Sequence, residues 1–72
     1  MQKNRIRILF NSLERQIPPD TALGDLIEQE QVPNPELAII ALNHKEVPRH
    51  LLSQTKLEEG DVIQVLYFLG DS

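Results

Sequence analysis

Cysteine is absent from this chain of 72 residues, and aromatic side chains make up only 4% of it. Without cysteine, neither disulfides nor thiolate metal sites can stabilise the fold, and nothing indicates an oxidising compartment. A chain of this length predicts one domain, near the lower size limit for a stable core. The hydrophobic residues, 40% of the chain, must therefore stabilise the fold unaided.

Basic charge is also scarce, because seven lysines and arginines face eleven acidic residues, for a net charge of -4. A phosphate backbone would be repelled by this surface, and the few aromatic residues offer no platform for stacking bases. No apolar run approaches the roughly 20 residues that span a bilayer. Lys3, Arg5 and Arg7 precede an alternating stretch, which argues against a secretory signal. We expect a cytoplasmic, monomeric protein that binds neither nucleic acid nor membrane.

The start of the chain predicts a hairpin of two strands. Residues 5–10 alternate with the period of a half-buried strand, and residues 13–17 predict a second strand. Asn11 and Ser12 between them suit a turn, so the two segments predict a hairpin. Pro18 and Pro19 end the second strand because proline removes backbone donors.

A short helix is predicted next, with Asp20 or Thr21 as its cap. Its buried stripe consists of apolar residues at helical spacing, Leu23, Leu26 and Ile27. Gly24 weakens helix propensity and therefore indicates a close approach to another element. Proline in the segment 33–35 ends the helical region.

The second half of the chain predicts an interior strand and a final strand. Residues 37–42 are apolar at every position, which is typical of a strand buried on both faces. We interpret residues 43–46 as a turn, Val47 as the start of a short return strand, and residues 49–56 as a loop with one helical turn. Residues 59–61 predict a tight turn directly before the last strand.

That last strand, residues 62–69, is apolar enough to be buried in a sheet, and only Gly70, Asp71 and Ser72 follow it. The order of elements favours an α+β domain with one helix against a mixed sheet of four to five strands. If the first and last strands pair in parallel, the helix belongs to the crossover between them. The β-grasp fold satisfies these conditions. We predict one domain over residues 1–72, with a flexible C-terminal tail at residues 70–72.

A partner-binding surface is expected on the outer face of the sheet. Alternation places Leu66 and Phe68 on one face of the last strand, and Leu9 of the first strand would share that face. One helix covers only one face, so these apolar residues would form an exposed patch. Arg7 and Arg49 could add complementary charge. The alternative is that the loop 49–56 covers this face.

Two groups of residues stand out: the segment from Ala41 to Arg49, which contains Asn43 and Val-Pro-Arg, and the segment from Leu57 to Ile63, which contains the Glu-Gly-Asp turn at 59–61. Together they resemble the ubiquitin-like sulfur carriers, above all the ThiS family of thiamin biosynthesis and more distantly the MoaD family of molybdopterin synthesis. The resemblance implies a carrier without an active site of its own. It implies that a ubiquitin-activating-type enzyme adenylates the C-terminal carboxylate with ATP, that a thiocarboxylate follows, and that thiazole synthase receives the sulfur.

The tail departs from the family pattern. Asp71 and Ser72 stand where the family has two glycines, and only Gly70 is retained. Beside nucleotide phosphates, the Asp71 carboxylate could cost on the order of 1 to 4 kcal/mol, and Ser72 adds a side chain next to the reacting carboxylate. Three interpretations stay open: a disabled carrier, a carrier with an altered tail, and a β-grasp interaction module that carries no sulfur.

Signals of an enzyme or a metal site are weak. His44 and His50 lack the further ligands that zinc requires, so we expect no metal and no bound cofactor. The glutamates are typical of a solvated helix face and a turn. Ser53 has no histidine and aspartate arrangement to activate it. We therefore predict no catalytic residues and a protein on which partner enzymes act.

Overall fold

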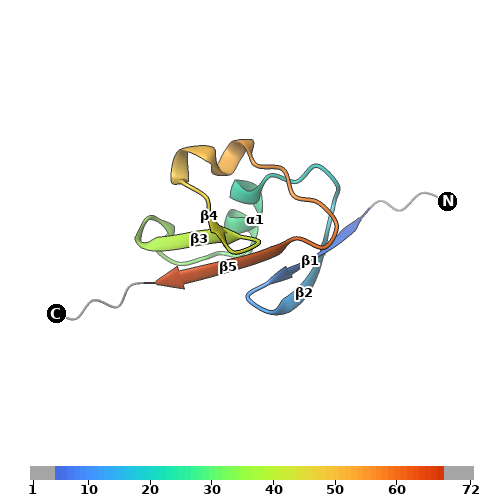
Figure 1. Cartoon of the computed structure of the whole chain (residues 1–72), viewed down its shortest axis with the longest axis horizontal. Coiled ribbons are helices and arrows are strands. Elements are labelled where there is room, and N and C mark those ends of the chain that lie inside the picture. Colours follow the sequence, from blue (N-terminus) through green and yellow to red (C-terminus); the bar gives the residue numbers. More distant parts are fainter. Residues whose placement is uncertain (1–4, 68–72) are drawn as a thin grey trace.

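The computed structural model describes residues 5–67 and shows one mixed sheet with a helical layer on one face. The sheet has the strand order β2-β1-β5-β3-β4, so the last strand lies at its centre (Figure 1). The α+β prediction and the β-grasp arrangement, with five strands and one main helix, are thus confirmed. The elements are β1 (Ile6–Phe10), β2 (Leu13–Ile17), α1 (Leu23–Gln29), η1 (Pro35–Leu37), β3 (Ala38–Leu42), β4 (Lys45–Glu46), η2 (Arg49–Gln54) and β5 (Val62–Tyr67).

The hairpin of β1 and β2 forms as predicted, with Phe10 paired to Leu13 across a loop of two residues. Asn11 and Ser12 both have positive φ, 50° and 71°. Such a turn has the twist that suits neighbouring strands, and asparagine tolerates the left-handed backbone that it requires. β1 then pairs in parallel with β5, as expected for a crossover through the helix.

The start of α1 differs from the prediction. Ala22 occupies the cap position, and no side chain caps the helix. Thr21 instead donates its hydroxyl hydrogen bond to the Pro18 carbonyl at 2.7 Å, which closes the loop before the helix. Asp20 has a φ of 68°, in the left-handed region, and so belongs to that loop.

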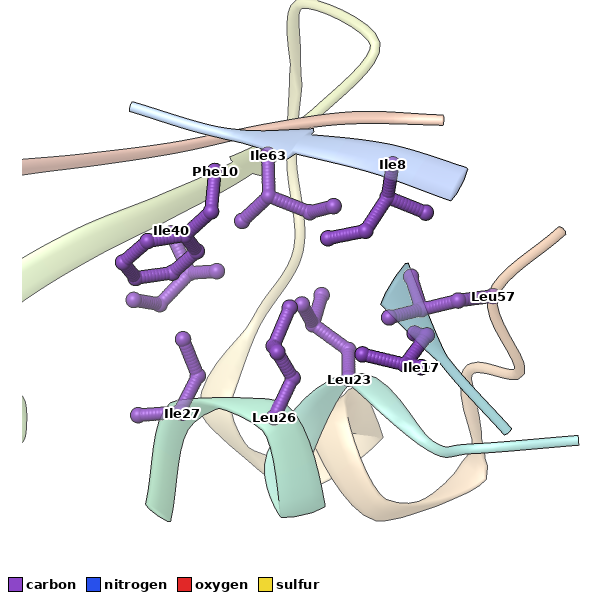
Figure 2. Close-up of a cluster of buried hydrophobic side chains, with 9 residues drawn as sticks. All are labelled: Ile8, Phe10, Ile17, Leu23, Leu26, Ile27, Ile40, Leu57 and Ile63. Carbon is purple, nitrogen blue, oxygen red and sulfur yellow. The ribbon is translucent and has the colours of Figure 1, made fainter. Parts of the chain in front are cut away.

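The core fills the space between the sheet and α1. Leu23, Leu26 and Ile27 face the sheet as their spacing predicts, and Ile8 and Ile63 point back at them from β1 and β5 (Figure 2). Four further buried residues complete the cluster: Phe10, Ile17, Ile40 and Leu57.

The helical turn η2 packs on α1 (Figure 1). A Cβ built on Gly24 would lie 3.4 Å from the Leu52 backbone carbon, so the predicted close approach of another element at Gly24 is confirmed. η2 spans 49–54, a longer helical segment than the single turn that we expected. Because η2 packs on the helix, the alternative that residues 49–56 cover the outer face of the sheet is wrong.

Two boundaries around the interior strand also differ. β3 begins at Ala38, because Leu37 closes the short turn η1 and is exposed. The return strand is Lys45–Glu46, not a segment starting at Val47. Asn43 and His44 both have positive φ, which makes a turn of two residues and brings the chain back two residues earlier than predicted.

Candidate functional site

The candidate site begins with β5, because this strand leads directly to the C-terminal residues. It pairs with β1 on one side and with β3 on the other, and its pairing with β3 continues to its last residue, Tyr67. The Tyr67 hydroxyl also donates a hydrogen bond to the Pro33 carbonyl. Phe68 and the carrier-tail residues Gly70, Asp71 and Ser72 lie outside the described residues. Within the described residues, β5 is held by β1, by β3 and by the Tyr67 side chain.

The start of β5 is fixed by a network that joins the two groups of residues on which the family resemblance rests. The Asn43 amide donates to an Asp61 carboxylate oxygen at 3.1 Å, and its carbonyl oxygen accepts the Val62 N–H at 2.9 Å. The other Asp61 oxygen accepts the Glu58 N–H at 2.8 Å. Gly60, with a φ of 88°, donates its N–H to the Arg7 carbonyl at 2.8 Å. The distant motifs thus meet at one corner, where they set the position at which β5 enters the sheet.

The outer face of the sheet carries exposed apolar side chains, as the alternation predicts. Leu9 is 41% exposed and Leu66 53% exposed. The register places Leu9 beside Val62 and Leu66 beside Ile39 of β3. Leu66 follows Val62 by four residues, about 13 Å along the strand. The two leucines therefore share a face but occupy its opposite ends, with Gln64 between them.

Arg7 lies on this outer face, between two acidic side chains. Its guanidinium is 3.6 Å from the Glu14 carboxylate and 3.9 Å from that of Glu59. These three residues line a surface depression together with Leu9 and Gly60. All three charged side chains are more than half exposed, so the ion pairs add little stability. The arrangement leaves an acidic rim beside Leu9 instead of an isolated positive charge.

Arg49 lies elsewhere. It is the first residue of η2, in the helical layer, and its guanidinium donates to the Glu36 carbonyl at 3.2 Å. The structure therefore separates Arg49 from Arg7 and Leu9, which the sequence had grouped on one surface. The physical reason is that η2 packs against α1, on the opposite side of the sheet.

Asn11 has a role in the sheet that the sequence did not predict, because the sequence indicated only that it belongs to a turn. The Asn11 side-chain oxygen accepts the Val65 N–H of β5 at 2.9 Å. Its side chain therefore reaches the strand that leads to the C terminus. The sequence signal for this contact is limited to an asparagine in a tight turn, which does not reveal where its amide points.

Residues 5–67 contain no cluster of three or more histidines and acidic residues that could hold a metal ion. His44 lies in the turn after β3, and His50 lies in η2. Within the same residues, no helix has the length and apolar character needed to cross a membrane.

Comparisons with known proteins agree with this geometry. A solved structure of the thiamine biosynthesis protein ThiS from Geobacter metallireducens superposes with a TM-score of 0.83. It is 20% identical and covers 93% of this chain and 100% of its own, which supports the fold. None of the curated proteins that were searched matches significantly. The family model named ThiS family matches residues 5–70, nearly the whole chain, so this protein belongs to the ThiS family of sulfur carriers.

Proposed function

We propose that this protein carries sulfur on its C-terminal carboxylate for the thiazole step of thiamin biosynthesis. The observation that carries the proposal is the placement of β5: the chain belongs to the ThiS family, and its central strand is the last element that the structure describes before the C-terminal residues. A carboxylate carried on the residues that follow β5 would enter a partner's active site while the sheet stays outside.

The chemistry belongs to partner enzymes. A ubiquitin-activating-type enzyme would bring ATP, the carboxylate would attack the α-phosphorus, and pyrophosphate would leave. A sulfur nucleophile would then replace AMP and give the thiocarboxylate that thiazole synthase consumes. The carrier contributes a correctly presented end, which makes the reaction effectively intramolecular once the complex has formed. It would act in the cytoplasm as a monomer that binds one partner after another.

The outer face offers a surface for docking these enzymes. Leu9 and Leu66 are exposed there, and η2 lies on the other side of the sheet. Phe68 follows on the same alternation, outside the described residues. Glu14 and Glu59 flank Arg7, so the rim near Leu9 favours a partner with basic side chains. Arg49 would contact a partner only from the helical side.

The C-terminal residues set the rate of the proposed reaction. An Asp71 carboxylate near ATP would raise the barrier by on the order of 1 to 4 kcal/mol, which slows adenylation by roughly 5- to 1,000-fold. The same residues favour the second candidate function, a β-grasp interaction module that carries no sulfur. A variant with the family ending, Asp71→Gly/Ser72→Gly, separates the two.

The experiment incubates the chain and this variant with a ThiS-activating enzyme, ATP and a sulfur donor, and records intact mass. The carrier function predicts a gain equal to the difference between one sulfur and one oxygen atom, faster in the variant. A gain in the variant alone would identify a carrier disabled by its tail. If neither protein gains mass while an authentic ThiS protein does, the carrier proposal is wrong and the interaction module stands.

A further inference from the structure

β1 and β5, which are neighbours in the sheet, end at different points along their shared direction. The parallel pairing of β1 with β5 covers Leu9 with Val62 and Phe10 with Ile63. The backbone hydrogen bond from the Asn11 N–H to the Ile63 carbonyl, 2.9 Å, follows at the end of β1. The chain then turns into β2, whereas β5 continues for four more residues. On its β1 side, the second half of β5 therefore extends past its neighbouring strand.

Asn11 compensates for this difference. Its side-chain oxygen accepts the Val65 N–H at 2.9 Å, two residues beyond the last paired position. The same residue thus donates a backbone bond to Ile63 and accepts a side-chain bond from Val65. The turn directs the backbone away, and with a φ of 50° Asn11 places its amide where a continuing strand would place a carbonyl. Asparagine suits this position because it combines tolerance of positive φ with an acceptor.

The consequence concerns the start of the C-terminal arm. Val65 lies two residues before Tyr67, the last residue of β5 that the structure describes. On its other side β5 is held by β3 as far as Tyr67. Without the Asn11 side chain, β5 beyond Ile63 would keep its pairing with β3 and the Tyr67 bond to Pro33 but would have no hydrogen-bond partner on its β1 side, so this half of the strand could twist away from β1. Such a shift would change the position from which the C-terminal residues start.

We infer that Asn11 is a positioning residue for the C-terminal arm, the residues that follow Tyr67, because it fixes the direction of the second half of β5. This inference rests on the proposed carrier function. Asn43 fixes the same strand at its other end through the Val62 N–H. The two asparagines therefore hold β5 from the turns of two different hairpins. Of these two contacts, that of Asn11 lies nearer the C-terminal residues.

The first test measures amide hydrogen exchange in the free protein. Asn11→Gly keeps a residue that accepts positive φ but removes the acceptor, whereas Asn11→Asp keeps an acceptor oxygen. We expect the Val65 amide to exchange about tenfold faster in Asn11→Gly, with protection restored in Asn11→Asp. The Ile63 amide reports any global loss of stability. The control Asn43→Gly should expose Val62 and leave Val65 protected. Unchanged protection of Val65 in Asn11→Gly would overturn the inference.

The second test uses the Asp71→Gly/Ser72→Gly background and the rate of thiocarboxylate formation. We expect Asn11→Gly to lower kcat several-fold with little change in KM for the carrier, and Asn11→Asp to restore kcat. Equal kcat values with and without Asn11 would overturn the inference and leave the carrier function intact. No product from the background protein itself would refute the carrier function, and the inference with it.

Discussion

Exchanging single residues on the two faces of β5 should separate partner binding from folding. Leu66 is 53% exposed on the outer face, whereas Ile63 on the same strand is 0% exposed. Leu66→Ser removes an apolar side chain that is only half buried. We therefore expect it to lower the free energy of unfolding by less than about 1 kcal/mol. Ile63→Ala leaves a cavity in the core and should cost about 2 to 5 kcal/mol.

Binding to the activating enzyme should depend on Leu66, although Leu66→Ser costs little stability. If Leu66 is a central contact of the docking surface, its loss should weaken binding to the activating enzyme by about 1 to 2 kcal/mol, or roughly 5- to 30-fold in Kd. Leu37→Ser is the matched control, because Leu37 is 62% exposed but lies in η1 instead of the outer face. Binding is measured by isothermal titration calorimetry and stability by urea unfolding.

The result that would refute this reasoning is specific. A Leu66→Ser protein that binds the enzyme as tightly as the unchanged chain would remove the outer face from the docking surface. Equal weakening by Leu37→Ser would also refute it, because the effect would then reflect any exposed leucine and not its position.

Three stability predictions follow from backbone geometry and are measured by urea unfolding. Asn43→Ala should lower the free energy of unfolding by about 1 to 3 kcal/mol, because it removes the hydrogen bonds to Asp61 and Val62 and places alanine at a φ of 53°. An unchanged urea midpoint would show that the contacts of Asn43 contribute no stability. Gly60→Ala should cost about 1 kcal/mol, since its φ is 88° although nothing lies within 4 Å of the added Cβ; a stabilised variant would contradict the strain argument. Gly24→Ala should stabilise α1 by up to about 1 kcal/mol, because its Cβ would meet Leu52 at 3.4 Å or more, and a large loss would show that the contact with η2 is tighter than van der Waals distance.

Periodicity predicted those features of the fold that depend on local sequence. Alternation predicted β1, the turn residues after it predicted the return strand β2, and the spacing of Leu23, Leu26 and Ile27 predicted the buried face of α1. Gly24 correctly indicated a neighbouring element, because a Cβ built there would meet Leu52 of η2 at van der Waals distance. These signals are local, so that a single sequence contains them.

The errors arose where distant segments decide the structure. The exception is local: Thr21 has the chemistry of a helix cap, but its hydroxyl bonds to Pro18, three positions earlier. Arg49 could be assigned to the outer face only while the position of η2 was unknown. The side chains of Asn11 and Asn43 reach β5 across 54 and 19 positions of sequence. Turn propensity explains why asparagine occurs at these sites, but only the assembled sheet shows which backbone groups it contacts.

The most direct measurement is fragment mass analysis of the chain and of Asp71→Gly/Ser72→Gly after incubation with the activating enzyme, ATP and a sulfur donor. If β5 presents a carboxylate to partner enzymes, sulfur should replace one oxygen in the last residue, at least in the glycine variant. Sulfur attached at any other residue, or absent from both proteins beside an active control, would contradict this mechanism.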